Sequence, residues 1–153
     1  MEIEDLLSAD CILADFKASS KKQAVQALAR QMALKTGLNA REIFAKLLER
    51  EKLGSTGVGR GVAIPHARID GLEGVTGIFA KLKSPIDFDS VDDHPVDLVF
   101  MLLAPEEAGT DHLKALAKVS RLLRDKETCE KLRMTEDASA IFAMLASPTS
   151  AAA

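Results

Sequence analysis

The longest apolar run of the chain, LVFMLLA at Leu98–Ala104, lies in a segment of nearly continuous apolar character that begins at Val96. A transmembrane helix needs about 20 such residues, so this run does not predict a membrane span. A short continuous run is typical of a central strand that is covered on both faces. The run therefore predicts a strand over Val96–Leu103 inside a sheet flanked by helices.

The rest of the chain alternates between helical and strand patterns. Apolar residues at positions 24, 25, 28, 29 and 32 form the inner stripe of a helix that Ser19 or Ser20 can cap and Gly37 can end. Asn39 and Thr110 are expected to cap two further helices. After Thr110, the expected inward residues are Leu113, Leu116, Ala117 and Leu123. Helices are expected over about 3–7, 21–35, 40–51, 110–124, 126–133 and 136–146, and strands over about 11–14, 62–64, 75–81 and 96–103.

This alternation predicts an α/β protein with a small mixed sheet flanked by helices. A length of 153 residues corresponds to one domain. We expect a single compact domain over residues 1–146 and a flexible tail over residues 147–153. The strand order does not follow from the sequence.

Charge, aromatic content and the placement of the cysteines disfavour several classes of protein. The chain has 20 basic and 23 acidic residues and no Trp or Tyr, which disfavours nucleic-acid binding. The N-terminal segment MEIEDLLSAD lacks the basic and apolar regions of a signal peptide. Cys11 and Cys129 lie far apart outside any CxxC motif, so reduced thiols and a cytoplasmic protein are expected.

A glycine-rich segment, GSTGVGRGVAIPHAR at 54–68, is the first candidate for a binding site. It is not a P-loop, because Arg60 and Gly61 follow Gly59 in place of Lys and Ser or Thr. It also lacks the GxGxxG pattern of dinucleotide sites, since Val62 replaces the third glycine. Successive glycine amides can nevertheless bind an anion, and nearby arginines could contribute. The alternative is a flexible connector with solvated arginines.

His66 follows Ile64 and Pro65 at the end of this segment. Proline restricts its own φ and favours an extended residue before it, which stiffens the backbone ahead of the imidazole. A neutral imidazole nitrogen can attack phosphorus if its ring is fixed and donors hold the phosphoryl oxygens. A structural role is the alternative for a lone histidine. The spacing of His66, His94 and His112 gives no metal-ligand motif.

The stretch REKLGSTGVGRGVAIPHAR at Arg50–Arg68 resembles the active segment of enzyme IIA of the phosphoenolpyruvate-dependent sugar phosphotransferase system, fructose/mannitol class. The resemblance continues through SPIDF at 84–88, HPVDLVFMLLAP at 94–105 and DHLKALAKVSRLL at 111–123, and covers roughly Leu6–Leu145. The lead-in to GSTG and the length most resemble the nitrogen-regulatory branch. Residues 1–146 are thus expected to form an enzyme IIA type-2 domain.

This resemblance implies that His66 accepts a phosphoryl group as a tele-phosphohistidine and that His112 lies beside it. A position in the first turn of a helix suits a neutral His112, because the helix dipole disfavours imidazolium. Arg50 is implied in stabilising the phosphoryl charge. The candidate phosphate cradle is Ser55, Thr56 and the Gly57 amide. His94, Arg60 and Arg68 are expected outside catalysis, with the arginines in partner recognition or solvation.

The implied function is that of a phosphotransferase component, a phosphocarrier that needs no cofactor or metal. The expected donor is an HPr-type phosphocarrier protein. In the nitrogen-related branch the phosphorylation state acts on a regulatory target, and in the sugar branch the phosphoryl group passes to a IIB domain. The absence of IIB, IIC or sensory extensions favours regulation. A histidine-dependent phosphohydrolase is the remaining alternative, and neither nucleic acid nor membrane insertion is expected.

Overall fold

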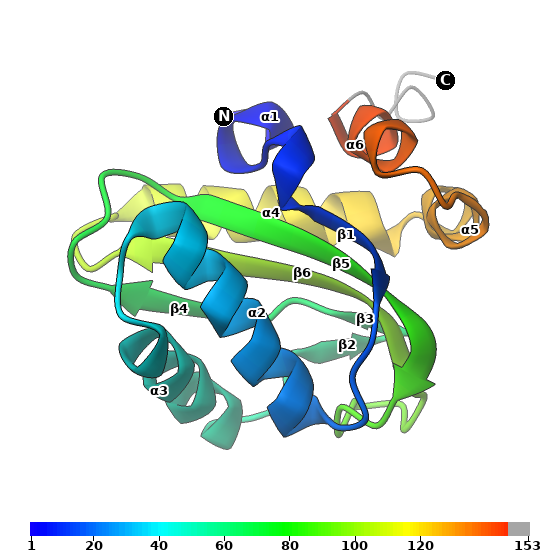
Figure 1. Ribbon diagram of the computed structural model, residues 1–153, viewed down its shortest axis with the longest axis horizontal. Helices are drawn as coiled ribbons and strands as arrows, with labels where there is room; N and C mark the ends of the chain where they lie inside the picture. Colours follow the sequence, from blue (N-terminus) through cyan, green and yellow to red (C-terminus); the bar gives the residue numbers. More distant parts are fainter. Residues whose placement is uncertain (147–153) are drawn as a thin grey trace.

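Strand β6 (Val96–Pro105) lies at the centre of a mixed, six-stranded sheet (Figure 1). On one side it pairs antiparallel with β5 (Thr76–Ile86), whose other edge pairs parallel with β1 (Ile12–Phe16). On the other side β6 pairs parallel with β3 (Val62–Ala63) and β4 (His66–Ile69), and β2 (Gly57–Gly59) pairs antiparallel with β3. The apolar run thus forms a central strand, as predicted.

The computed structural model describes residues 1–146, and the predicted tail over 147–153 lies outside the described residues. Helices α2 (Lys21–Thr36) and α3 (Ala40–Lys52) cover one face of the sheet, while α4 (Thr110–Arg124) crosses the other (Figure 1). Next to α4 and β1 lie α1 (Ile3–Leu6), the short 3-10 helix η1 (Ala9–Cys11), α5 (Lys126–Met134) and α6 (Ala138–Ala146). This arrangement confirms the expected α/β class with a small mixed sheet flanked by helices.

Side-chain caps set the start of the first two long helices. Ser20 accepts a hydrogen bond from the Gln23 amide, and Asn39 accepts one from the Glu42 amide, as expected. The predicted cap at Thr110 is wrong: Thr110 is already helical, and Gly109 holds the N-cap position without a side-chain cap. Gly109 has a φ of 61°, a conformation that glycine adopts easily, and this turns the chain into α4 one residue earlier.

The core forms along β6, where residues 98–104 are fully buried. Phe100 meets Phe79 of β5 edge to face, with ring centroids 6.1 Å apart. The predicted inner stripe of α4 is partly wrong, because Leu113 is 62% exposed and Ala117 is also exposed. Of the other predicted residues, Leu123 is buried and Leu116 is partly buried against the core. The helix also buries His112, Ala115, Val119 and Leu122. Across residues 1–146, no helix is both long and apolar enough to span a membrane.

Candidate functional site

His66 is the first residue of β4. Residues 64–65 separate β4 from β3, and both strands pair with β6. Val62 pairs with Leu98 and His66 pairs with Leu102, so β3 and β4 follow β6 in one register. The interruption at residues 64–65 has its own hydrogen bonds, because Ile64 donates to the Thr56 carbonyl and Pro65 accepts from the Leu102 amide. The sheet therefore fixes the backbone on both sides of the residue that precedes the imidazole.

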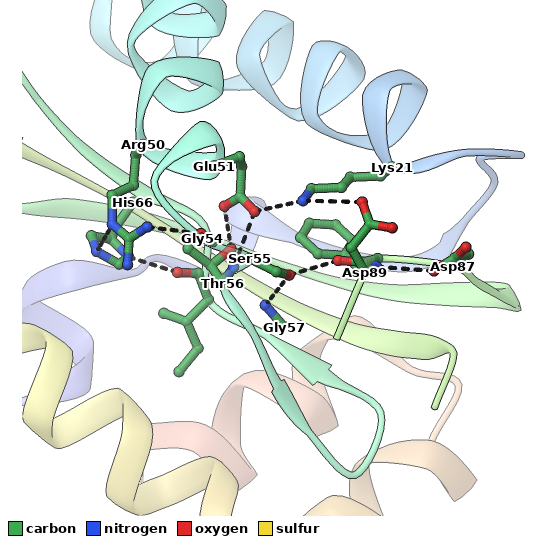
Figure 2. A network of polar contacts seen from close by, with 12 residues as sticks. Lys21, Arg50, Glu51, Gly54, Ser55, Thr56, Gly57, His66, Asp87 and Asp89 are labelled. Carbon is green, nitrogen blue, oxygen red and sulfur yellow. Dashed lines mark hydrogen bonds and ion pairs between the residues drawn. The ribbon is translucent and has the colours of Figure 1, made fainter. Parts of the chain in front are cut away.

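The hydrogen bonds of His66 define its tautomer. Nδ1 lies 2.8 Å from the carbonyl oxygen of Ile64. Since a carbonyl oxygen only accepts, Nδ1 carries the proton and Nε2 carries the lone pair. Arg50 donates its Nε–H to this Nε2 at 3.3 Å (Figure 2). The ring thus has its lone pair on Nε2, and a phosphoryl group bound to this nitrogen would make a tele-phosphohistidine.

Arg50 lies in the last turn of α3 and links this helix to the glycine loop. Besides His66, its guanidinium donates to the Gly54 carbonyl at 2.9 Å (Figure 2). The end of the helix thereby places a positive charge and several N–H donors next to the imidazole. An anion bound at Nε2 would meet these donors directly.

His112 is buried in the first turn of α4, with 6% of its surface exposed. Its ring centroid lies 5.6 Å from that of His66, and the two rings are inclined by 70°. Nδ1 of His112 accepts a hydrogen bond from Nε of Arg68 at 3.1 Å. Its proton is therefore on Nε2, which is buried and has no hydrogen-bond partner among the described residues.

Both histidines are held in the neutral form. Burial lowers the pKa of His66 from its usual value, and the charge of Arg50 adds to this, against the opposing effects of the Ile64 carbonyl and Glu51. Burial, followed by repulsion from His66 in its protonated form and from Arg68, lowers the pKa of His112 to about 4. Near pH 7 one ring thus offers a lone pair and the other an N–H.

An open pocket of about 690 Å³ joins these groups between α3, β4 and α4. The exposed side chains of Leu53 and Leu113 lie on its border, 84% and 62% exposed respectively. Apolar residues beside a polar site are typical of a surface on which another protein docks. The polar side chains that line the pocket and take part in the contacts above are Arg50, His66, Arg68 and His112.

The candidate cradle residues Ser55, Thr56 and Gly57 bind other parts of the protein (Figure 2). The Ser55 hydroxyl donates to the Phe88 carbonyl at 2.6 Å and accepts from the Gly57 amide at 3.0 Å. Thr56 donates both its amide, at 3.0 Å, and its hydroxyl to the carboxylate of Glu51. These contacts shape the loop, and a direct contact with phosphate stays a prediction for all three residues.

The buried carboxylate of Glu51 and the cation that pairs with it were not predicted from the sequence. Glu51 forms an ion pair with Lys21 at 2.9 Å, and the Lys21 ammonium also lies 5.0 Å from the centre of the Phe88 ring. This cluster ties the start of α2 to the end of α3 and to the loop (Figure 2). No local pattern marks Glu51, apart from its place directly after Arg50.

Two other residues stand away from this pocket. His94 is exposed on the connection between β5 and β6, and Arg60 lies in the β2–β3 turn, where it donates to the Arg124 carbonyl. Arg68 remains exposed, as expected for a solvated arginine, but it also contacts His112, a contact that the sequence did not predict. Within residues 1–146 there is no group of three or more His, Cys, Asp or Glu residues that could hold a metal.

An α/β domain that sets a neutral, lone-pair imidazole against an arginine and a second histidine is suited to carrying a phosphoryl group on histidine. The family model described as "Phosphoenolpyruvate-dependent sugar phosphotransferase system, EIIA 2" matches residues 5–147. The chain belongs to this family, which confirms the resemblance inferred from the motifs.

Several relatives of known name match most of the chain. The nitrogen regulatory protein of Bradyrhizobium diazoefficiens is 56% identical over 153 residues, the whole of both chains. The crystal structure of nitrogen regulatory protein IIA-Ntr from Neisseria meningitidis is similar with a TM-score of 0.89 and 37% identity, covering 94% of this chain and 98% of that one. The crystal structure of IIA mannitol from Escherichia coli gives 0.77 and 25%, covering 92% and 99%.

Proposed function

We propose that the protein accepts a phosphoryl group on Nε2 of His66 from an HPr-type phosphocarrier protein and acts as a regulator through its phosphorylation state. The observation that carries this proposal is the pair of contacts on one ring. The Ile64 carbonyl accepts from Nδ1–H, so the lone pair is on Nε2, where Arg50 donates to it until the phosphoryl group arrives. Membership of the phosphotransferase family supports the same chemistry.

In the transfer step a bond forms between Nε2 of His66 and phosphorus, while the bond from phosphorus to the donor's histidine breaks in line. The phosphoryl group arrives on a protein, so no cofactor is required. Arg50 releases the lone pair and donates to the incoming oxygens, and the Nε2–H of His112 supplies a further donor. Pre-positioned donors of this kind stabilise the spreading negative charge without reorganisation of solvent.

The loop contributes by holding this geometry. Glu51 fixes Thr56, and Ser55 fixes Gly57 and the chain at Phe88, so the backbone leading to β3 is anchored. To bind phosphate as well, these donors would have to exchange their protein acceptors for phosphoryl oxygens. We assign them first to positioning and second to the phosphate cradle.

The relatives support a regulatory output in a nitrogen-related phosphotransferase system, acting on a target protein in the cytoplasm. Two of them bear the name nitrogen regulatory protein and align over nearly the whole chain. The alternative is a sugar-transport component that passes the phosphoryl group to a IIB domain. The similarity to IIA mannitol supports this alternative.

A phosphohydrolase is less well supported, because its water would need a general base. Nδ1 of His112 already accepts from Arg68, and its Nε2 carries the proton. Neither nitrogen of His112 can therefore take a proton from water in this arrangement.

The test is phosphorylation with labelled phosphoenolpyruvate, enzyme I and an HPr-type carrier. We expect one acid-labile, base-stable phosphate in the wild type and in His94→Ala, the matched control, and none in His66→Ala. Equal labelling of His66→Ala would refute the assignment. Rapid release of the label to water in the absence of an acceptor protein would instead favour the hydrolase.

Adding a purified IIB domain separates the two carrier roles. A regulator should keep its label in the presence of a sugar-specific IIB domain, whereas a transport component should transfer it rapidly. Complete transfer to such a IIB domain would reverse our assignment of the output.

A further inference from the structure

Arg68 sits where it can control the second histidine. It follows His66 by two residues on β4, and its Nε lies 3.1 Å from Nδ1 of His112, which is 44 positions away in the sequence. We infer that Arg68 is a positioning residue that fixes His112 in the Nε2–H tautomer and holds its ring against the phosphoryl site. The tautomer is a property of the unphosphorylated protein, while its purpose rests on the proposed function.

The donors and acceptors of Arg68 and His112 allow only one tautomer of the neutral imidazole. A guanidinium has five N–H donors and no acceptor, so it can bind a neutral imidazole only at the nitrogen that carries the lone pair. A proton on Nδ1 would face the Nε–H of Arg68 at 3.1 Å, donor against donor. The contact with Arg68 therefore excludes the Nδ1–H tautomer and places the proton on Nε2.

The guanidinium of Arg68 is itself held in place by two backbone carbonyls. Its two terminal nitrogens lie 3.4 Å from the carbonyl oxygens of Glu106 and Gly109. Both carbonyls belong to the connection between β6 and α4, directly before the turn that carries His112. The planar guanidinium thus joins β4, the connection and the imidazole, and this sets the direction of the ring.

The resulting Nε2–H of His112 is a buried donor that lies near His66. Nε2 of His112 is buried and has no hydrogen-bond partner in the described part of the chain, although its ring lies 5.6 Å from that of His66, centre to centre. A buried donor without an acceptor is unfavourable, and an acceptor that reaches it gains more than one that meets a solvated donor. A phosphoryl oxygen on His66 is such an acceptor, so Arg68 prepares His112 to stabilise the phosphorylated form.

The experiment reads the His112 ring directly, by long-range ¹H–¹⁵N correlation on the unphosphorylated, ¹⁵N-histidine-labelled protein near pH 7.5. The wild type should show the pattern of a pure Nε2–H tautomer at His112. Arg68→Met removes the donor and should give a mixed or averaged pattern. Arg68→Lys keeps a group that can only donate, so it should restore the Nε2–H pattern. Arg121→Gln, at an exposed site on α4, is the matched control and should leave it unchanged.

A second variant covers the case in which Arg68→Met does not fold. Arg68→Leu also removes the donor and offers neither a donor nor an acceptor, so this variant should likewise give a mixed or averaged pattern. If His112 keeps a pure Nε2–H pattern in whichever of these two variants folds, the inference is overturned.

The same variants then enter the phosphorylation assay. With Arg68→Met, or with Arg68→Leu if that is the variant that folds, we expect acceptance or retention of the label to fall on the order of tenfold, with the His66 tautomer unchanged. Undiminished acceptance and retention would overturn the positioning role. If the wild type itself takes no label, the proposed function fails while the tautomer measurement still decides the contact, so the two failures are distinguishable.

Discussion

His66 donates its Nδ1 proton to the carbonyl oxygen of Ile64 at 2.8 Å, and the two residues are separated only by Pro65. This bond leaves the lone pair on Nε2, where Arg50 meets it. The proline stiffens the backbone between donor and acceptor, and β3 and β4 hold both ends against β6. Main-chain geometry therefore decides which nitrogen keeps the lone pair.

Arg50 is expected to be the strongest electrostatic contributor after His66 itself. Arg50→Ala should lower the rate of phosphoryl acceptance on the order of 100-fold, since it removes donors from the developing charge. Arg50→Lys should lose less, because it keeps the charge but cannot bridge His66 and Gly54 in one plane. Rapid-quench measurement of label uptake checks this. Arg41→Ala, at an exposed site on the same helix, is the control, and equal rates for Arg41→Ala and Arg50→Ala would contradict the role.

Glu51 is expected to support the loop more than the chemistry. Glu51→Gln removes the charge that binds Lys21 and weakens the hold on Thr56, so the free energy of unfolding should fall by about 1–3 kcal/mol. Denaturant unfolding measures this change. Glu49→Gln, at an exposed site on the same helix, should leave stability nearly unchanged. A Glu51→Gln variant as stable as Glu49→Gln would show that the buried cluster does not hold the loop.

Gly57 has no room for a side chain. A Cβ at this position would lie 2.3 Å from Oγ and 3.1 Å from Cα of Ser90, so Gly57→Ala must displace the backbone and should lower the free energy of unfolding by about 1–3 kcal/mol. Gly74 has nothing within 4 Å of the same position and provides the control. Thermal unfolding of both alanine variants checks the difference. Indistinguishable midpoints would mean that the loop moves freely away from Ser90.

The low pKa of His112 predicts a pH dependence of stability. The unfolded chain binds a proton at this histidine near the usual pKa of about 6.5, while the folded protein does so only at about 4. Between these values the unfolded state binds more protons, so the free energy of unfolding falls as the pH falls from about 6.5 to about 4. The contribution of this residue reaches at most roughly 3 kcal/mol.

The comparison of wild type with His112→Asn isolates this contribution from those of other titrating groups. The stability of the wild type relative to the variant should decline through that window and level off below it. Denaturant unfolding at several pH values measures both curves. If the curves run parallel from pH 7 to pH 4, His112 is not held neutral by the fold.

Several features could be predicted from the sequence because each depends on neighbouring residues. These are the central strand, the caps at Ser20 and Asn39, and the spacing of the helices. The buried side of α4 could not be predicted in the same way. Apolar residues lie on two sides of this helix, with Leu113 and Leu116 on one and Ala115 and Val119 on the other. The structure buries the side that also carries His112. That burial depends on the sheet beneath the helix, which the local pattern does not contain.

The same distinction applies to the site. His66, His112 and Arg50 were found through motifs, and the structure brings all three together. The contact of Arg68 with His112 was not predicted, because the two residues lie 44 positions apart and the pairing of β4 with β6 brings Arg68 beside α4. The contact of Thr56 with Glu51 could not be predicted, because a loop hydroxyl gives no sign of which acceptor it will meet, and its contact with phosphate stays a prediction.

The most direct test of the account locates the phosphoryl group on the ring. The ¹⁵N-histidine-labelled protein is phosphorylated through enzyme I and an HPr-type carrier, and coupling between ³¹P and ¹⁵N is recorded. The account predicts a single phosphorylated nitrogen, Nε2 of His66, with Nδ1 still protonated toward Ile64. Phosphate on Nδ1 of His66, or on His112, would contradict it.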